Sequence, residues 1–281
     1  MRTFTFKSLF LTVLFMLLGS TAILAADDGL NTTQVTIKLD EAGTLPDKIR
    51  YDQKNLITNL KIVGKINGTD LKFIREMAGR DFNREKTDGK LSILDLSEAK
   101  IVEGGDAYVS YYDDRYTYND NLGRGAFWGC SGLTSLTLPS GVTSIGGYTF
   151  YGCSGLTSLT IPSSVTSIGE SAFYGCSGLT SIYVYPENLP ELGTDIFTGC
   201  DAKNCTVYVP KGTYDAYKSS EFGYFEKIVE FDATGIDKVT TSTNAKEVSR
   251  YSANGQQLSA PAKGLNIVKY SDGSVKKVVV Q

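Results

Sequence analysis

The residue types best suited to chemistry gather in one stretch, between positions 106 and 120. Tyrosines and aspartates make up most of it, namely Tyr108, Tyr111, Tyr112, Tyr116, Tyr118, Asp106, Asp113, Asp114 and Asp120. Tyrosine offers a large contact area with a polar tip and has little entropy to lose, which suits a binding surface. Aromatic rings beside carboxylates also suit sugars. The alternative is a loop that folds over its neighbours and uses the tyrosines as a local core.

The aspartates allow two further interpretations. Carboxylate oxygens bind calcium, but Asp113, Asp114 and Asp120 follow no EF-hand or repeat-type calcium spacing. A glycosidase needs two carboxylates held apart across a cleft, and nothing in the sequence indicates a cleft. We therefore expect solvated charges, with no metal and no cofactor.

The chain of 281 residues contains no histidine. This removes the commonest general base and metal ligand near neutral pH. It excludes Ser-His-Asp and Cys-His catalysis and ordinary His-containing zinc sites. We therefore expect a protein that is not an enzyme and has no catalytic residues.

Three segments nearly copy one another at a step of 23 residues. They read FWGCSGLTSLTL at 127–138, FYGCSGLTSLTI at 150–161 and FYGCSGLTSIYV at 173–184. A repeat of this length is typical of a solenoid, in which each repeat is one coil stacked on the last. One coil cannot bury its own apolar face, so neighbouring coils must share a continuous core.

Each repeat predicts a strand and a return segment. Along the strand Leu136 and Leu138 point inward and Thr137 points outward, and Pro139 ends the strand. A second apolar pair closes the far side of each coil, and we align these pairs as Val142 with Ile145, Val165 with Ile168, and Leu189 with Leu192. The outward positions form a second candidate surface for a partner, made of Thr134, Thr137, Thr157, Thr160, Thr180 and Tyr183.

The five cysteines follow the repeat in part. Cys130, Cys153 and Cys176 recur at the 23-residue step, so we interpret them as a buried column of small apolar side chains. Cys200 and Cys205 are closer together, and export would permit a disulfide between them. The sequence leaves that pairing open.

The pattern continues into irregular ends. Upstream we expect strands over 57–62 and 91–96 and a helix over 71–77 capped by Thr69 or Asp70. Downstream we expect a strand over 205–210, a short helix over 213–219 and a closing strand over 225–231. Alternating runs and the turns Asn254-Gly255 and Asp272-Gly273 predict a small all-β module, with strands over 247–251, 256–258, 264–270 and 274–280.

The first 26 residues have the layout of a secretory signal peptide. Arg2 and Lys7 precede an apolar run over 9–24, and the small residues Ala25 and Ala26 then favour cleavage. No later stretch is long and apolar enough to cross a bilayer. Cleavage would change the formal net charge from −3 to −5; residues from Gly235 onward carry +4 and the remainder −9. An acidic body argues against a nucleic-acid partner.

The period Phe-x-Gly-Cys-x-x-Leu-x-x-Leu-x-Leu-Pro-x-x-Val-x-x-Ile-Gly, seen over 123–210, resembles the BspA-type leucine-rich repeat of bacterial surface proteins. The segments 67–75 and 94–97 resemble the N-terminal part of such proteins in Bacteroidetes. The tail, at 251–256, 263–267 and 276–280, resembles their C-terminal β modules, which include sorting domains read by the type IX secretion route. The resemblance implies export, surface exposure and adhesion or protein binding, and it implies no particular ligand.

We therefore expect four parts. They are a signal peptide at 1–26, an N-terminal cap region at 27–90, a leucine-rich repeat solenoid at 91–234 with a tyrosine-rich insertion at 104–121, and a sorting or attachment module at 235–281.

The expected function is recognition or adhesion, in secreted form or at the outer cell surface. The expected partners are a protein or glycan ligand and, through the C-terminal module, export machinery. The expected binding residues are Tyr108, Tyr111, Tyr112, Tyr116, Tyr118, Asp113, Asp114 and Tyr183. The alternatives are a carbohydrate-active enzyme that uses the loop carboxylates and a structural envelope component without a host ligand. Deletion of 106–120 is expected to abolish binding and leave the melting curve intact.

Overall fold

The computed structural model describes residues 30–111 and 113–232 and four strands within 247–280. The predicted signal peptide at 1–26 lies outside the described residues. Of the strands within 247–280, side-chain placement is described only for Val268, which is buried.

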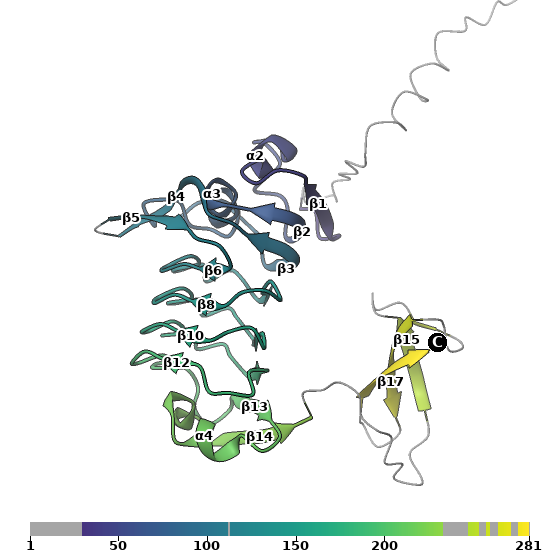
Figure 1. Ribbon diagram of the computed structural model, residues 1–281. Helices are drawn as coiled ribbons and strands as arrows, with labels where there is room; N and C mark the ends of the chain where they lie inside the picture. Colours follow the sequence, from purple (N-terminus) through teal and green to yellow (C-terminus); the bar gives the residue numbers. More distant parts are fainter. Residues whose placement is uncertain are drawn as a thin grey trace, which may run out of the picture.

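One parallel sheet runs through the whole repeat body (Figure 1). Its strands follow one another in chain order, as β1 (Val35–Leu39), β2 (Asn59–Ile66), β3 (Ile93–Ile101), β7 (Ser135–Thr137), β9 (Ser158–Ile161), β11 (Ser181–Val184), β13 (Thr206–Pro210) and β14 (Lys227–Phe231). Each coil therefore adds one strand beside the last, as the repeat predicts. The sheet extends without a break into the region before residue 91, because β3 pairs with both β2 and β7.

A second, narrower parallel sheet closes the far side of the coils. It consists of β6 (Asn121–Leu122), β8 (Ser144–Ile145), β10 (Ser167–Ile168) and β12 (Glu191–Leu192). Val142, Ile145, Val165 and Ile168 are buried between the two sheets, which confirms the second apolar pair in these coils.

The alignment of Leu189 with the buried residues Val142 and Val165 is wrong. Leu189 is 38% exposed, and Leu192 is only partly buried against the core. The last coil is one residue longer than the others. Its extra length forms a loop with Pro186 and Pro190 that stands off Val165 and leaves a hollow between them.

The interior is built of columns of identical side chains. Phe127, Phe150, Phe173 and Phe197 are buried, with consecutive ring centroids 5.3 to 5.6 Å apart and nearly parallel. Such aromatic pairs add about 0.5–1.5 kcal/mol each beyond their area burial. The cysteine column lies beside them: the thiol of Cys153 donates to the Phe127 carbonyl at 3.0 Å, and that of Cys176 to the Phe150 carbonyl at 3.2 Å.

Backbones of neighbouring coils touch directly at glycines in two positions of the repeat, one represented by Gly155 and Gly178 and the other by Gly146, Gly169 and Gly193. A Cβ atom added to Gly169 would lie 2.3 Å from the backbone nitrogen of Gly147, and one added to Gly193 would lie 2.3 Å from that of Glu170. No real Cβ contact is that short, so these positions exclude a side chain while the coils keep their spacing.

Helix α3 (Gly68–Met77) closes the N-terminal end of the core. Its N-cap is Asn67 and not Thr69 or Asp70 as expected. The Asn67 side chain accepts from the Thr69 amide at 3.0 Å, and Asp70 accepts from the Asn67 amide at 2.9 Å, which is a capping box. Asp70 is therefore the third residue of the helix and not its cap. Its carboxylate also accepts from the amides of Gly43 and Leu45, at the start of the short helix α2 (Leu45–Lys48).

Arg75 joins this helix to the first coil. Its side chain is fully buried, and one Nη atom donates to the carbonyls of Gly125 and Ala126 at 2.9 and 2.8 Å. These contacts bridge about 50 residues of sequence, so the position of α3 fixes the position of the first repeat turn.

The C-terminal end is closed by α4 (Tyr214–Lys218), the 3-10 helix η2 (Glu221–Tyr224) and β14. Phe222 and Phe225 pack on Phe197 at 4.9 and 5.0 Å and end the phenylalanine column. The predicted helix and closing strand are therefore confirmed, each slightly shorter than expected.

A separate antiparallel sheet follows, ordered β16-β15-β17-β18. Its strands are β15 (Glu247–Ser252), β16 (Gln257–Leu258), β17 (Gly264–Tyr270) and β18 (Val275–Val280). They match the predicted strands within about one residue. The predicted turns at Asn254-Gly255 and Asp272-Gly273 lie outside the described residues.

Substituting one interior leucine tests the inward assignment. Leu159 is 1% exposed on β9, so Leu159→Ala should lower the free energy of unfolding by about 2–5 kcal/mol in denaturant melts. The neighbouring Thr160, on the outer face of the same strand, provides the control: Thr160→Ala should stay within about 0.5 kcal/mol of wild type. A loss below about 1 kcal/mol for Leu159→Ala would contradict a shared interior.

Candidate functional site: the tyrosine hairpin and the hollows beside it

The tyrosine-rich insertion forms a hairpin outside both sheets of the solenoid (Figure 1). It consists of β4 (Gly104–Tyr111) and β5 (Asp113–Thr117), paired antiparallel. Because β3 pairs with β7 and β6 pairs with β8, the hairpin between β3 and β6 is an excursion from the coil. The repeat body therefore carries the hairpin as an addition beside its first coils.

One face of the hairpin is anchored to the body. Tyr108 and Val109 are each 1% exposed, and the Tyr108 hydroxyl donates to the Arg124 carbonyl at 3.0 Å. The amide of Ser110 donates to the Phe82 carbonyl at 3.0 Å. The interpretation as a local core thus holds for Tyr108. Because Tyr108 and Val109 are part of the buried core, we expect deletion of 106–120 to lower the melting temperature, in contrast to the expectation from the sequence alone.

Other side chains of the hairpin are exposed to solvent. Tyr116 is 47% and Tyr118 63% exposed. Asp113 lies 3.1 Å from an Nη atom of Arg115 in an exposed ion pair. The side chain of Tyr111 and the whole of Tyr112 lie outside the described residues. Of the expected binding residues with described side chains, the hairpin thus offers two tyrosines and two aspartates on or near its outer surface.

Tyr183 lies elsewhere. It is on β11 of the main sheet, where its ring stacks on Tyr208 at 4.6 Å and meets the edge of Phe231. The sheet order places β7 and β9 between β3, the strand before the hairpin, and β11. The structure therefore does not bring Tyr183 together with the hairpin tyrosines.

Three other residues of the outward threonine surface have a role within the solenoid. The hydroxyls of Thr134, Thr157 and Thr180 each donate to a backbone carbonyl of the preceding coil, at 3.1, 3.2 and 3.0 Å. These bonds tie coil to coil, so threonine at this position contributes to stacking.

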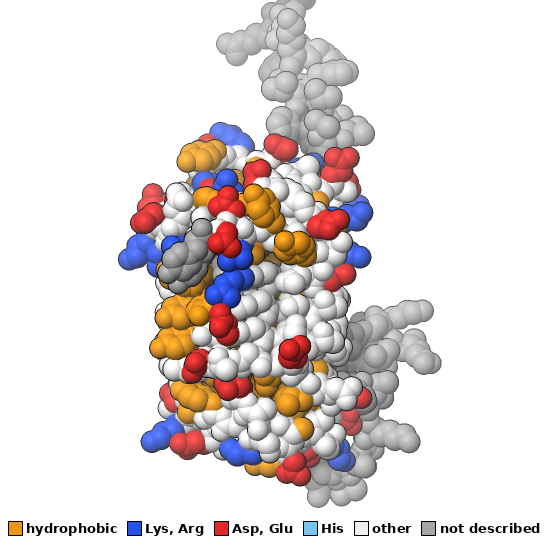
Figure 2. All heavy atoms as spheres, turned by 60° about the vertical axis from the view of Figure 1, so that its left-hand side comes forward, with side chains coloured by type: hydrophobic (Ala, Val, Ile, Leu, Met, Phe, Trp, Pro, Cys, Tyr) orange, Lys and Arg blue, Asp and Glu red, His pale blue; other side chains and the backbone are white. Residues whose placement is uncertain are grey.

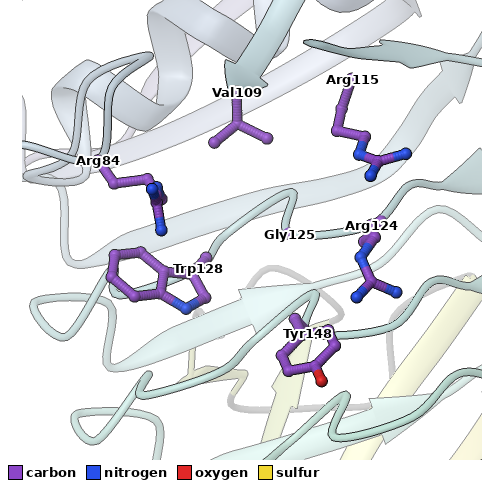
Figure 3. Close-up of a pocket in the computed structure, with 7 residues that line it drawn as sticks. All are labelled: Arg84, Val109, Arg115, Arg124, Gly125, Trp128 and Tyr148. Atoms are coloured by element: carbon purple, nitrogen blue, oxygen red, sulfur yellow. The ribbon is translucent and has the colours of Figure 1, made fainter. Parts of the chain in front are cut away.

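Two adjoining hollows lie between the hairpin and the first coils. The first, which we name the arginine hollow, is lined by Arg84, Arg115 and Arg124 with Trp128, Tyr148, Val109 and Gly125. Figure 3 shows these side chains arranged around the space, Arg84 and Trp128 on one side and Arg124 on the other. The second, which we name the tyrosine groove, includes Tyr116, Tyr118, Asp114 and Asn121 in its lining. Arg115 and Arg124 line both hollows.

Aromatic rings hold the guanidinium groups of the arginine hollow. Arg124 lies 4.5 Å from the ring centroid of Tyr148, and Arg84 lies 5.2 Å from that of Trp128. The Trp128 ring in turn stacks on Tyr151, and Tyr151 on Tyr174, so its support continues down the coils. Cation–π contacts of this kind fix the plane of an arginine side chain.

Sequence reasoning missed the arginines, Trp128 and Tyr148. One available signal was the single tryptophan of the chain, Trp128, where the next coils have Tyr151 and Tyr174. Another was Tyr148, where the equivalent positions hold Gly125, Ser171 and Asp195. Both residues break the repeat at the coils nearest the hairpin.

The carboxylates do not form a hydrolytic pair. Asp113 and Asp114 are consecutive on β5, and successive side chains of a strand point to opposite faces. They therefore do not face one another across a cleft as glycoside hydrolysis requires. Within the described part of the chain, no group of three or more Cys, Asp or Glu side chains could hold a metal ion.

All five cysteines are buried, and none forms a disulfide, including Cys200 and Cys205. Burial raises the pKa of the Cys130 thiol to about 11 and that of Cys205 to about 12. At neutral pH these thiols are therefore protonated and poor nucleophiles, which agrees with their interpretation as small apolar side chains.

No helix among the described residues is both long and apolar enough to span a bilayer. No curated protein matches the chain. A solved structure, a leucine-rich repeat protein from Bacteroides ovatus ATCC 8483, is similar at 22% identity with a TM-score of 0.36. The match covers 70% of this chain and 42% of that one, so the chain corresponds to less than half of that protein.

A family model for the BspA type leucine-rich repeat region matches residues 117–228 in six copies. This range contains the coils from β7 to β13 and the start of β14. Proteins of this repeat family are associated with surfaces and with protein interaction and are typically not enzymes. Residues 117–228 of the repeat body are therefore similar in sequence to the BspA type leucine-rich repeat region.

Proposed function

We propose that this chain is an exported cell-surface recognition protein that binds a protein or glycan ligand without catalysis. The observation that carries the proposal is the hairpin, whose inner face is anchored by Tyr108 while Tyr116 and Tyr118 present 47% and 63% of their surface to solvent. A ligand that binds exposed aromatic rings on a rigid support loses little entropy of the protein.

The solenoid supports this function by its rigidity. Its coils are joined through backbone ladders, threonine hydroxyls and continuous buried columns. The hairpin is fixed to this body at Ser110, Tyr108 and Asp106, the last through its amide to the Thr69 hydroxyl at 2.9 Å. Recognition residues on such a scaffold are held before the ligand arrives.

Neither alternative has comparable support. An enzyme that uses the loop carboxylates would need Asp113 and Asp114 on one cleft, and they are consecutive on a strand. A purely structural envelope component would have no use for two exposed tyrosines beside a hollow lined by three arginines.

Two regions of the sequence, residues 1–26 and the C-terminal sheet, support the part of the proposal that concerns export. Residues 1–26 have the charge and hydropathy pattern of a signal peptide. The C-terminal sheet of β15 to β18 is the candidate sorting or attachment module, with export machinery as its partner.

Binding should depend on the exposed tyrosines. We expect the full chain to bind at least one member of a printed panel of purified glycans and extracellular matrix proteins. Replacing Tyr116→Ser and Tyr118→Ser together should weaken that binding at least tenfold, since central aromatic anchors typically contribute about 2 kcal/mol or more. The control Tyr214→Ser removes a tyrosine of similar exposure, 41%, from the opposite end of the solenoid. Equal binding by the double variant and wild type would contradict the proposal, as would no binding to any panel member.

The predicted signal peptide has a direct readout. When the chain is produced with its own N-terminus in a bacterium with a secretion pathway, mass spectrometry should find a mature protein that begins at Ala26 or Asp27. The reason is the small-residue exit at Ala25 and Ala26, which signal peptidase prefers. Recovery of an intact N-terminus from the cytoplasmic fraction would contradict export.

A further inference from the structure

We propose that the arginine hollow and the tyrosine groove together bind an acidic glycan, with its carboxylate or sulfate held by the guanidinium groups of Arg115 and Arg124, the two arginines that line both hollows. This inference rests on the proposed recognition function and names its ligand class. It is carried by the charge of the hollow, by the geometry of its arginines and by an unusual backbone conformation at Tyr148.

The charge of the hollow is opposite to that of the chain as a whole. The sequence holds 28 basic and 31 acidic residues. The arginine hollow nevertheless has three arginines and no acidic residue in its lining. Figure 2 shows Lys and Arg side chains together with Asp and Glu on the upper part of this face, above coils that carry few charges. A concave surface lined by residues of one charge sign favours a ligand group of the opposite sign.

The acidic partners of these arginines leave room for a ligand. Asp113 pairs with an Nη atom of Arg115 at 3.1 Å and Glu170 with Nη1 of Arg124 at 2.9 Å. Both carboxylates are well exposed, at 68% and 46% of the side chain, and neither lines the hollow. Exposed ion pairs are weak, and a guanidinium has five N–H donors. Arg115 and Arg124 therefore each have more N–H donors than these ion pairs use.

The guanidinium planes are held in advance. Arg124 lies over Tyr148 and Arg84 over Trp128. A fixed planar fork can bind a carboxylate or sulfate with two parallel hydrogen bonds. A ligand anion that reaches Arg124 from the tyrosine groove would therefore meet a guanidinium plane that is already fixed.

Tyr148 is kept in a conformation that disfavours a large side chain. Its φ is 57°, and the equivalent residues Gly125, Ser171 and Asp195 have φ of 67°, 51° and 57°. Glycine adopts this left-handed region freely and Asp tolerates it, whereas a bulky residue there is strained. Strain of this kind clusters at functional sites. The aromatic ring therefore occurs at the one coil where it can support Arg124.

The tyrosine groove favours a sugar as the body of the ligand. Tyr116 and Tyr118 lie two residues apart, about 7 Å along an extended chain. Both line the groove, and their exposed rings can pack on the C–H faces of sugar rings. Asp114 and Asn121 add acceptors and donors in the same groove, which suits hydroxyl groups that donate and accept at once. An acidic peptide would use the arginines and leave this polar and aromatic set without a role.

The test compares four probes by isothermal titration with the full chain. They are polygalacturonate, which carries carboxylates, heparin, which carries sulfates, neutral dextran and poly-glutamate. We expect binding to polygalacturonate, heparin or both, weakened by added salt, and the stronger of the two identifies the anionic group. Arg115→Gln and Arg124→Gln should each lower the affinity at least tenfold. Arg50→Gln, which removes an exposed arginine paired with Asp52 far along the sequence, should leave it unchanged.

Two further variants separate binding from folding. Glu170→Gln frees Arg124 from its carboxylate, so it should raise the affinity about threefold, as expected for removal of a weak exposed competitor. Tyr148→Asn relieves the strained φ while removing the ring, so it should weaken binding without lowering the melting temperature. A merely structural role for this cluster would produce neither result.

Other outcomes overturn the inference in distinguishable ways. Equal binding of dextran would show a neutral glycan site, and poly-glutamate binding with the same arginine dependence would show an acidic-peptide site. Failure of both acidic glycans to bind would also overturn it. If a panel ligand depends on Tyr116 and Tyr118 but is unaffected by Arg115→Gln and Arg124→Gln, the proposed function stands and the anionic ligand class fails. If the tyrosines have no effect either, both fail.

Discussion

The structure depends on direct contact between the backbones of successive coils. At Gly146, Gly169 and Gly193 there is no space for a Cβ atom against the preceding coil. This close approach brings the strands of both sheets into register and places each phenylalanine on the one before it. The dry interior, the ring stacking and the thiol-to-carbonyl bonds follow from that spacing, because each needs its partner one coil away.

The same spacing explains why recognition residues occur outside the regular coils. An aromatic side chain stacked between two others exposes only the edge of its ring to a ligand, as in the column of Trp128, Tyr151 and Tyr174. The hydroxyls of threonines such as Thr157 donate to the preceding coil. Side chains that are available to bind a ligand therefore occur where the repeat is interrupted. The hairpin between β3 and β7 is such an interruption, and Arg75 fixes the cap helix and the first coil that support it.

Much of this fold could be predicted from the sequence, because a 23-residue repeat fixes local and long-range structure together. The inward leucines and the column of Cys130, Cys153 and Cys176 followed from position in the repeat alone. The prediction that Leu189 is buried was wrong, because one added residue and two prolines change the loop in that coil. Asn67 was missed as the helix cap because Asp70 has two further amides to satisfy, on a segment distant in sequence.

The candidate site was less predictable for a related reason. The tyrosines were visible as a cluster, but which of them point inward depends on where the hairpin begins and what it packs on. Arg84, Arg115 and Arg124 come from the cap, the hairpin and the first coil, so only the fold brings them together. Their companions, Trp128 and Tyr148, show in the sequence only as departures from the repeat.

The most direct test of close backbone stacking is the free energy of unfolding of Gly169→Ala beside Gly132→Ala. A methyl group at Gly169 would meet the Gly147 nitrogen at 2.3 Å, whereas one at Gly132 meets nothing within 4 Å. If the coils are in direct contact, Gly169→Ala should lower the free energy of unfolding by about 2 kcal/mol or more, because the methyl group overpacks against backbone. Gly132→Ala should change it by no more than about 0.5 kcal/mol. Equal stability of the two variants would contradict the stacked arrangement on which the recognition surface depends.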